Sequence, residues 1–531
     1  MRRKGILLLT VIIVLMGSAF TPDDDKDKEI LKAIRKGHVQ KLKGFINEGL
    51  DVNAVYKGRK LLHYAIRKDE YEVSRLLINS GADVDAFHDD SNPLIEAVDS
   101  YSPDILELLI ANGAKIDRTD SDGNTALMHA VNEEEVELVK ILFESGASRK
   151  IKNNRGKTPF EYVNRYHENP VLEYINKMKV LHHHVDTLPD MRDGPYIQME
   201  DNRLKVEYFI HDSSENRTWR EYRFFDTEDK SLTFKGFAGD TNTYHLSLDF
   251  RREPSKIQGV RKVFFLGDIH GMYDKLTKLL KSHSIIDSAL NWNFGKGHLV
   301  FTGDVFDRGS KVTETLWLIH ELKYQAQKSG GDVHYILGNH EMMALKKDYR
   351  YLASKYLFFS QFFFREYSQW FAEDTYLGQW IRTKNVAMKM DHKLIVHAGF
   401  SPRVLNQRLT LDEINKIFQL HLKGERFRVP YIQDLIVSGD GPVWYRGYVA
   451  NSREYTEVEN SLVEKTLRYY GASKLIVGHM PHYTVKTMYD GKVYLIDVPV
   501  GKTGYLAQGL LIEGDKYYKC SENGRCIEIE N

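Results

Sequence analysis

The chain has 531 residues, of which 42% are hydrophobic and 28% charged, and its 74 Lys and Arg residues equal its 74 Asp and Glu residues in number. This length exceeds what one hydrophobic core holds, so two or three domains are expected in a protein of ordinary globular composition. The balanced charge produces no field that would attract nucleic acid or an anionic membrane surface, and it argues against both as partners.

The first residues have the layout of a secretory signal. A basic start precedes the largely apolar run 5–17, which is followed by the small side chains of Ser18 and Ala19. The run is shorter than the ~20 residues that a membrane helix needs, so we expect residues 1–19 to be removed and residues 20–28 to be a linker. The protein would then be exported, periplasmic or secreted, with no stable membrane anchor. If the signal is not cleaved, it would anchor an outward-facing chain.

The chain has two cysteines, Cys520 and Cys526, which flank five residues near the C-terminus. Asn523-Gly524 between them is a hairpin signal, and a loop of this length would place the cysteines opposite each other. In an exported protein this arrangement indicates a disulfide that closes the last hairpin. Two free thiols are the alternative, and the spacing does not support a zinc site.

A sequence repeat occupies residues 29–178. Gly-Leu-Asp-Val-Asn begins at residue 49, and related pentapeptides begin at residues 81, 113 and 146, which are steps of 32 or 33 residues. Each unit also has a version of the helix start Thr-Pro-Leu-His-x-Ala. The period and these signatures resemble ankyrin repeats, with four units after an N-terminal half unit that would act as a cap.

The resemblance implies an all-α solenoid that binds a protein partner on its concave face, because one helix pair cannot bury its apolar face alone. A spacer that aids solubility or positioning is the alternative. His63 and His129 occupy the histidine position of the repeat, where the side chain bonds to neighbouring backbone, so we do not expect them to be metal ligands.

Residues 179–258 differ in character from the repeats. Three histidines at 182–184 and a segment with Pro, Asp and Gly up to Tyr196 are typical of a linker. Polar and apolar residues then alternate in four runs, which begin at Leu204, Trp219, Ser231 and Tyr244. Alternation with a period of two predicts antiparallel strands. We expect a small β sheet that packs between the repeats and the last domain, with no function that the sequence identifies.

Residues 259–531 contain five short polar motifs, each placed after an apolar run that predicts a buried strand. The motifs are Gly-Asp-Ile-His-Gly (267–271), Gly-Asp-Val-Phe-Asp-Arg-Gly (303–309), Gly-Asn-His-Glu (338–341), His-Ala-Gly (397–399) and Gly-His (478–479). In open α/β sheets, ligands bind outside the carboxyl ends of the strands. Five such ends that present Asp, His, Asn and Arg predict a site for metal ions and phosphate.

The motifs and their order resemble the phosphoprotein phosphatase branch of the calcineurin-like metallophosphoesterases. The resemblance implies an α/β sandwich with two central sheets for residues 259–531. His-Ala-Gly at 397–399 and Trp-Tyr-Arg-Gly at 444–447 are closer to bacterial, Shewanella-like members than to eukaryotic serine/threonine phosphatases. The eukaryotic substrate-groove sequences are not found, so a preference for phosphoserine is not implied.

By this resemblance, two divalent metal ions would be bound by carboxylate, amide and imidazole groups. The implied ligands are Asp268 and His270 for the first ion, Asp304 for both ions, and Asn339, His397 and His479 for the second ion. A hydroxide shared by the two ions would attack the phosphorus atom. Such ligands accept manganese, iron or zinc, and we expect manganese.

Four further residues are implied to act on the phosphoryl group. His340 is similar to the general acid that protonates the leaving oxygen, and Asp307 would orient it and raise its pKa. Arg308 would bind the phosphoryl oxygens, since a guanidinium group matches their geometry. Arg446 is the candidate for a second phosphate-binding arginine, with a buried structural ion pair as the alternative.

The aromatic segment 349–380 lies between the third and fourth motifs and predicts a helical cap with a packed core. The alternative is a mouth lining that selects aromatic phosphosubstrates. Taken together, we expect an exported phosphatase that hydrolyses phosphomonoesters of Ser/Thr or Tyr phosphoproteins, with the repeats as a protein-binding platform. Two alternatives remain, a phosphoesterase for small molecules or nucleotides and an interaction protein with a weak phosphatase site.

Overall fold

In a computed structural model of the protein, residues 24–162, 170–182, 188–227, 231–449, 457–500 and 504–530 are described. The predicted signal, residues 1–19, lies outside these residues, as do His183 and His184 of the histidine run. Among the described residues, no helix has the length and apolar character needed to cross a membrane. The chain forms two compact units, one up to residue 172 without residues 144–146, and one with the remaining residues.

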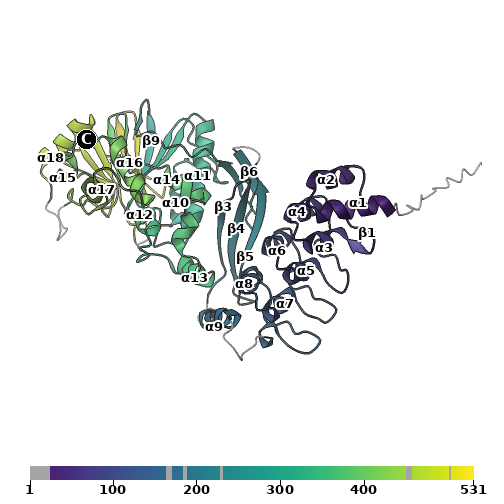
Figure 1. The fold of residues 1–531 in the computed structure, drawn as a ribbon. Coiled ribbons are helices and arrows are strands. Elements are labelled where there is room, and N and C mark those ends of the chain that lie inside the picture. Colours follow the sequence, from purple (N-terminus) through teal and green to yellow (C-terminus); the bar gives the residue numbers. More distant parts are fainter. Residues whose placement is uncertain are drawn as a thin grey trace, which may run out of the picture. The chain divides into compact units, whose positions relative to one another are not determined.

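The first unit is a row of helix pairs (Figure 1). The helices are α1 (Asp24–Arg35), α2 (Val39–Asn47), α3 (Leu61–Ile66), α4 (Tyr71–Asn79), α5 (Pro93–Asp99), α6 (Pro103–Ala111), α7 (Ala126–Asn132) and α8 (Val136–Glu144). A hairpin of β1 (Val55–Tyr56) and β2 (Arg59–Lys60) precedes α3, and η1 (Pro159–Glu161) opens the fourth predicted repeat.

The N-terminal half unit predicted from the sequence is wrong, because α1 and α2 form a complete helix pair. The first helix lacks the helix-start signature of the other units, and its sequence is rich in Asp and Lys. Ile30, Ala33 and Ile34 nevertheless form an apolar stripe that is fully buried. Such a stripe, spaced at three and four residues, is enough to pack a helix against its neighbours.

Antiparallel strands open the second unit. β3 (Met191–Met199), β4 (Arg203–Asp212) and β5 (Arg217–Asp226) form a sheet in this order, and β6 (Ser231–Lys235) pairs with β7 (Thr243–Ser247). The four predicted strands are therefore confirmed.

The prediction of a linker up to Tyr196 is wrong, because β3 runs through this segment. The register between β3 and β4 shifts between Asp193 and Tyr196, where Gly194 and Pro195 lie. Proline cannot donate a hydrogen bond to a neighbouring strand, so it is tolerated where the ladder is interrupted by a bulge.

The β3–β4–β5 sheet packs against the aromatic segment of the catalytic part. This segment consists of α13 (Ser354–Phe362), η2 (Tyr367–Phe371) and α14 (Tyr376–Arg382). The Tyr196 and Trp370 rings lie 4.9 Å apart, and the Phe209 and Phe363 rings 4.6 Å apart. The predicted packed core of the aromatic segment is confirmed, and the sheet forms one of its walls.

Two six-stranded sheets form the centre of the catalytic part, as expected from the family resemblance. The first has the order β11-β10-β9-β17-β18-β19 and the second the order β15-β16-β14-β13-β12-β8. The strands are β8 (Lys256–Ile257), β9 (Lys262–Leu266), β10 (His298–Phe301), β11 (Asp332–Tyr335), β12 (Ala387–Met390), β13 (Lys393–Val396), β14 (Lys474–Val477), β15 (Lys486–Met488), β16 (Val493–Leu495), β17 (Gln508–Glu513), β18 (Lys516–Ser521) and β19 (Cys526–Glu528).

Apolar side chains of both sheets, such as Phe265, Val300, Ile395 and Ile476, form one buried core. The helices of this part are α10 (Tyr273–Ser282), α11 (Val312–Lys328), α12 (Asn339–Leu345), α15 (Pro402–Asn406), α16 (Leu411–Leu422), α17 (Pro430–Val437) and α18 (Asn460–Tyr470). A disulfide joins Cys520 of β18 to Cys526 of β19, which confirms the predicted pairing.

Candidate metal and phosphate site

Parallel strands place the predicted site residues at shared sheet edges. β9, β10 and β11 are parallel neighbours in one sheet, and β13, β14 and β16 are parallel neighbours in the other. The carboxyl ends of β9, β10, β11, β13 and β14 lead into the five polar motifs. Residues far apart in sequence therefore meet at one place. All ten predicted site residues lie there.

A cavity of about 360 Å³ lies at these strand ends. Its lining consists of Asp268, Ile269, His270, Met272, Asp304, Arg308, His340, Arg446, His479, Pro481, Asp497, Pro499 and Val500. The other three predicted residues lie directly behind this lining. Asp307 contacts His340, His397 contacts His479, and Asn339 contacts His397. A larger cavity of about 690 Å³ between the small β sheets and α11 is lined by none of the predicted residues.

The backbone at the site is held in conformations that non-glycine residues rarely adopt. Five of the ten predicted residues have positive φ angles: His270 (48°), Asp304 (53°), Asp307 (67°), Arg308 (63°) and His479 (60°). Residues in the left-handed region cost free energy and persist where the surrounding structure imposes them, as at many active sites. The tight turns therefore aim these side chains into the cavity.

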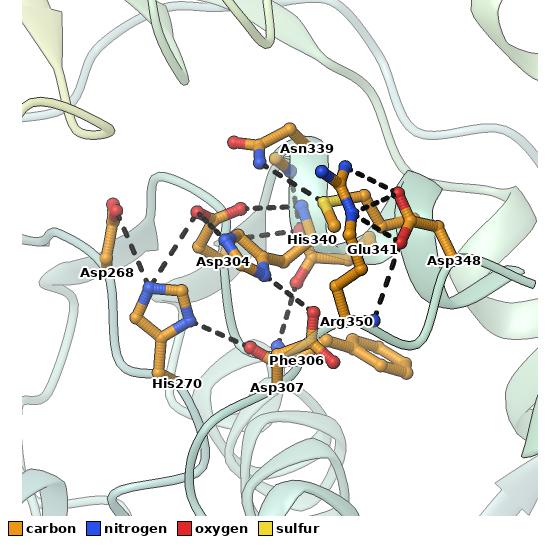
Figure 2. A network of polar contacts seen from close by, with 12 residues as sticks. Asp268, His270, Asp304, Phe306, Asp307, Asn339, His340, Glu341, Asp348 and Arg350 are labelled. Carbon is orange, nitrogen blue, oxygen red and sulfur yellow. Dashed lines mark hydrogen bonds and ion pairs between the residues drawn. The ribbon is translucent and has the colours of Figure 1, made fainter. Parts of the chain in front are cut away.

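One group of possible metal ligands contains His270, Asp268 and Asp304 (Figure 2). Nε2 of His270 lies 4.0 Å from Oδ2 of Asp268 and 3.9 Å from Oδ2 of Asp304. All three side chains are buried. The spacing of these atoms leaves room for one cation among them.

A second group contains His397, His479 and Asn339, and it uses the other oxygen of Asp304. Nε2 of His397 lies 3.3 Å from Oδ1 of Asp304. The same nitrogen lies 3.0 Å from Oδ1 of Asn339 and 3.2 Å from Nδ1 of His479. Asp304 thus presents one oxygen to each group, which is the arrangement that a bridging carboxylate requires.

Each histidine of the two groups uses its remaining ring nitrogen for a backbone carbonyl. The pairs are Nδ1 of His270 with Phe306 O at 2.9 Å, Nδ1 of His397 with Thr302 O at 2.7 Å and Nε2 of His479 with Trp444 O at 3.2 Å. A carbonyl acceptor fixes the tautomer and leaves the lone pair of the other nitrogen for a metal. The donor chemistry therefore fits divalent ions.

The pKa values of the site residues also indicate that the site fits metal ions. Burial and the charge of Asp304 raise the pKa of Asp268 to about 6. Burial lowers the pKa of His397, but the Asp304 carboxylate outweighs it and raises this pKa to about 10. Buried carboxylates that repel each other gain free energy when a cation enters between them. This is a second observation that the residues fit metal ions.

His340 and Asp307 form a separate pair beside the metal-binding groups. Nδ1 of His340 lies 2.6 Å from Oδ2 of Asp307, and its Nε2 lies 3.8 Å from Oδ2 of Asp304 (Figure 2). Burial lowers the pKa of His340, but the charge of Asp304 and the hydrogen bond to Asp307 produce a net increase. The bond to Asp307 leaves His340 with Nε2 facing the cavity, where it could donate a proton.

Arg308 and Arg446 both line the cavity. Within the described part of the chain, neither guanidinium group forms an ion pair with a carboxylate. The alternative of a structural ion pair for Arg446 is therefore not supported there. Two arginines that face a cavity without a partner are suited to bind an anion such as phosphate.

Two residues at the site were not predicted from the sequence. Glu341 is the last residue of the third motif, and its carboxylate accepts hydrogen bonds from the backbone N–H groups of Asp304, Val305, Phe306 and Gly338. It joins the second and third motif loops. A buried glutamate within a strand-end motif was the signal that could have identified it.

Asp497 lines the cavity and is buried, with 4% of its surface exposed. Burial and the charge of Asp268 raise its pKa well above the usual value. It follows the apolar strand β16, so it obeys the same strand-end pattern as the other site residues. A lone Asp within Ile-Asp-Val-Pro lacks the glycines that marked the five motifs.

Comparisons with known proteins agree with both units. The calcineurin-like phosphoesterase family matches residues 261–483. Ankyrin repeats match residues 57–89 as one copy and residues 94–179 as three copies.

Solved and curated relatives are each similar to part of the chain. The crystal structure of the cold-active protein-tyrosine phosphatase of a psychrophilic Shewanella species is similar with a TM-score of 0.57 and 32% identity, over 64% of this chain and 100% of that chain. An uncharacterized protein of Schizosaccharomyces pombe is 29% identical over 46% of this chain and 74% of its own length. Shewanella-like protein phosphatase 1 of Plasmodium berghei is 27% identical over 44% of this chain and 66% of its own length.

Proposed function

Because the chain belongs to the calcineurin-like phosphoesterases, with ankyrin repeats before the catalytic part, we propose that it is an exported two-metal phosphatase for phosphoproteins. The family implies a hydrolase that requires divalent metal ions. The position of Asp304 is the observation that carries the proposal, since its two oxygens face two separate groups of buried ligands.

The residues that would hold the metal ions are the six predicted ones. Asp268, His270 and Asp304 would hold the first ion. Asp304, Asn339, His397 and His479 would hold the second. Bound there, two divalent cations would supply Lewis acidity and an activated water molecule. Manganese is the metal we propose, because oxygen and imidazole ligands suit it and the site has no thiolate.

The other residues would act directly on the substrate. Arg308 and Arg446 would bind the phosphoryl oxygens and orient the ester. As the oxygen of water bonds to phosphorus, the ester P–O bond breaks, and Nε2 of His340 gives its proton to the leaving oxygen. The products are an alcohol and inorganic phosphate. Asp307 holds the imidazole in place and favours its protonated form.

A phosphoprotein substrate is supported by the first unit and by the relatives. Two relatives are named as protein phosphatases, one of them as a protein-tyrosine phosphatase. In the repeats, Val55 and Phe87 are 32 residues apart in equivalent loops, with 53% and 44% of their surfaces exposed. Exposed apolar side chains at equivalent repeat positions suit the docking of a protein chain.

Export is supported by the predicted signal in residues 1–19 and by the Cys520–Cys526 disulfide, since disulfides persist in oxidising compartments. Expression in a bacterial host followed by fractionation and N-terminal sequencing tests this part. Mature protein that begins after Ala19 and is found outside the cytoplasm is the expected result. Full-length protein in the cytoplasm would contradict it.

The catalytic proposal is tested with a turnover panel in the presence of Mn²⁺. The substrates are p-nitrophenyl phosphate, phosphoserine, phosphothreonine and phosphotyrosine peptides, nucleotides and bis-p-nitrophenyl phosphate, each with the Asp304→Asn variant as control. We expect phosphopeptides to be hydrolysed well above nucleotides, and the control to be inactive. Turnover confined to nucleotides would favour a small-molecule phosphoesterase. Metal-loaded protein that hydrolyses none of them would favour an interaction protein.

A further inference from the structure

Two aromatic side chains of the segment 349–380 are about half exposed, Tyr351 at 47% and Phe364 at 48%. Most of the other rings are buried in the core, for example Tyr356, Tyr367 and Trp370, with at most 1% of their surfaces exposed. Phe364 contacts the ring of Tyr174, away from the site residues, whereas Tyr351 lies beside predicted catalytic groups.

The position of Tyr351 links it to the catalytic groups. Its ring centroid lies 5.2 Å from that of His340 and 5.7 Å from the guanidinium carbon of Arg308. It therefore flanks both the predicted proton donor and the predicted phosphate-binding arginine. Within the described residues, its hydroxyl group makes no hydrogen bond. The guanidinium carbon of Arg350 lies 5.8 Å from the ring centroid, so the ring has a cationic group of Arg350 near it as well as that of Arg308.

The backbone around Tyr351 is fixed even though its side chain is not. The backbone N–H of Arg308 donates a hydrogen bond of 2.8 Å to the carbonyl oxygen of Tyr351. The neighbouring Arg350 forms an ion pair of 2.7 Å with Asp348 beside His340, which Figure 2 shows. Tyr349 bonds to Ser368 through its hydroxyl at 2.8 Å. The backbone of Tyr351 is thus held next to Arg308, which lines the cavity.

We propose that Tyr351 is a specificity-determining residue that stacks on the leaving group and favours aryl phosphates, such as phosphotyrosine, over alkyl phosphates. This inference rests on the proposed function, because it assigns Tyr351 to the leaving-group side of the same site. His340 must approach the ester oxygen, and in an aryl phosphate the ring begins at the atom bonded to that oxygen. The ring therefore comes within reach of Tyr351. The first atom of a phosphoserine side chain is a methylene carbon, which offers no face to stack on.

The cavity lining, which does not include Tyr351 itself, suits the same substrate. Ile269, Met272, Pro481, Pro499 and Val500 contribute apolar surface beside the charged groups. A phosphoryl group has no use for apolar surface, whereas an aromatic leaving group buries its carbon atoms against it. Aromatic pairs add stabilisation beyond the area that they bury.

The test compares two peptides of one sequence, one with phosphotyrosine and one with phosphoserine, in full-length Mn²⁺-loaded protein. Phenyl phosphate and glycerol 2-phosphate repeat the comparison without a peptide. The variants are Tyr351→Ala, Tyr351→Leu and Tyr351→Phe. The matched control is Tyr431→Ala, which removes a tyrosine with 60% of its surface exposed on α17, away from the cavity lining.

We expect Tyr351→Ala and Tyr351→Leu to lower the ratio of kcat/KM for aryl over alkyl substrates about three- to ten-fold, the range of one aromatic pair. Tyr351→Phe and Tyr431→Ala should leave the ratio within about two-fold. An equal loss on both substrates would overturn the inference, because it would mean that Tyr351 merely supports His340. An unchanged ratio in Tyr351→Leu would overturn it even if Tyr351→Ala fails to fold.

Failure of the proposed function has a different signature. If the Asp304→Asn variant hydrolyses phenyl phosphate as fast as the unaltered protein, the site itself is misassigned and both ideas are overturned. If Asp304→Asn is inactive and the aryl-to-alkyl ratio does not respond to Tyr351, only the inference about Tyr351 is overturned.

Discussion

Histidines of the repeat unit and histidines of the cavity are equally prominent in the sequence motifs but have opposite surroundings. In the repeats, both ring nitrogens are occupied by protein atoms. Nε2 of His63 lies 2.9 Å from the carbonyl oxygen of Ala86, and its Nδ1 lies 3.3 Å from Glu96. His129 lies between Asp99 and Asp120, at 2.9 and 3.0 Å.

In the cavity, one nitrogen of each predicted ligand bonds to a backbone carbonyl, and the other faces carboxylate or imidazole ligands grouped around a common point. In the repeats each ring nitrogen has one partner, whereas in the cavity the second nitrogen of His397 lies within 3.3 Å of three possible ligand groups, on Asp304, Asn339 and His479. The difference teaches that a candidate metal ligand is recognised by several ligand groups around its second nitrogen rather than by the carbonyl on its first.

Asp304→Asn gives the sharpest test of this difference. The change removes charge from the carboxylate whose two oxygens face the two ligand groups, so we expect a loss of kcat on the order of 10³-fold and a lower metal content. The matched change in the repeats, Asp120→Asn, also alters a carboxylate that holds a histidine. Activity and metal content, measured by elemental analysis, should be unchanged in Asp120→Asn. An equal loss of activity and metal content in both variants would contradict the difference between the cavity and the repeats.

His340→Asn should lower kcat for phosphoserine peptides about 100-fold, because the leaving oxygen loses its proton donor. p-Nitrophenyl phosphate should suffer much less, since its leaving group is stable without protonation. Activity in the unaltered protein should fall as pH rises through the raised pKa of His340, because only the protonated ring donates.

Asp307→Asn removes the carboxylate charge that helps to raise this pKa, so the alkaline limb of the pH–rate profile should move to lower pH. A limb that stays in place would show that another group controls it.

Asp497→Ala tests whether the comparison extends to a residue outside the motifs. The charge of Asp268, a predicted ligand, acts on the buried Asp497, and residues that support a ligand in this way typically change metal affinity 10- to 100-fold. We expect about 10-fold weaker Mn²⁺ binding in competition with a chelator. The control is Asp515→Ala, an exposed aspartate in the turn before β18. Equal affinities in the two variants would limit Asp497 to a role in packing.

His129→Gln should have the smallest effect, about 1 kcal/mol in the free energy of unfolding of the repeats. Burial lowers the pKa of His129, but hydrogen bonds to Asp99 and Asp120 raise it overall. A raised pKa in the folded state stabilises below the unfolded value of about 6.5 and loses this effect as pH rises through the folded value.

Chemical denaturation followed on both sides of this pH range measures the contribution of His129. The unaltered repeats should lose stability with rising pH, and the variant should lose less. Metal content should not change in either case.

The parts of the molecule that the sequence predicted have a pattern that repeats or a strong local signal. The repeats were predicted from their period of 32 or 33 residues, and the site was predicted from five glycine-containing motifs that follow apolar runs. β3 was missed because Gly194 and Pro195 interrupt its alternation, and the bulge that accommodates them depends on the partner strand. The first helix pair was missed because packing needs only its apolar stripe.

Residues that act through tertiary contacts were the hardest to predict. Glu341 acts on backbone groups of a loop 35 to 37 residues earlier in the chain, and Asp497 reaches Asp268 from a different sheet. Tyr351 had the same local sequence character as the other aromatic residues of its segment, and its nearness to His340 and Arg308 separates it from them. Such roles depend on three-dimensional proximity that a single sequence does not encode locally.

Glu341 accepts hydrogen bonds from four backbone N–H groups, and these bonds affect how the metal centre assembles. They fasten the loop of Asp304 to the loop of Asn339 by protein contacts alone. The entropy of ordering these loops is then lost during folding of the chain rather than during metal capture. Stripping the metal with a chelator should leave the amides of Asp304, Val305 and Phe306 protected from hydrogen exchange, and Glu341→Gln should expose them. Metal ions would then enter a scaffold that is already rigid.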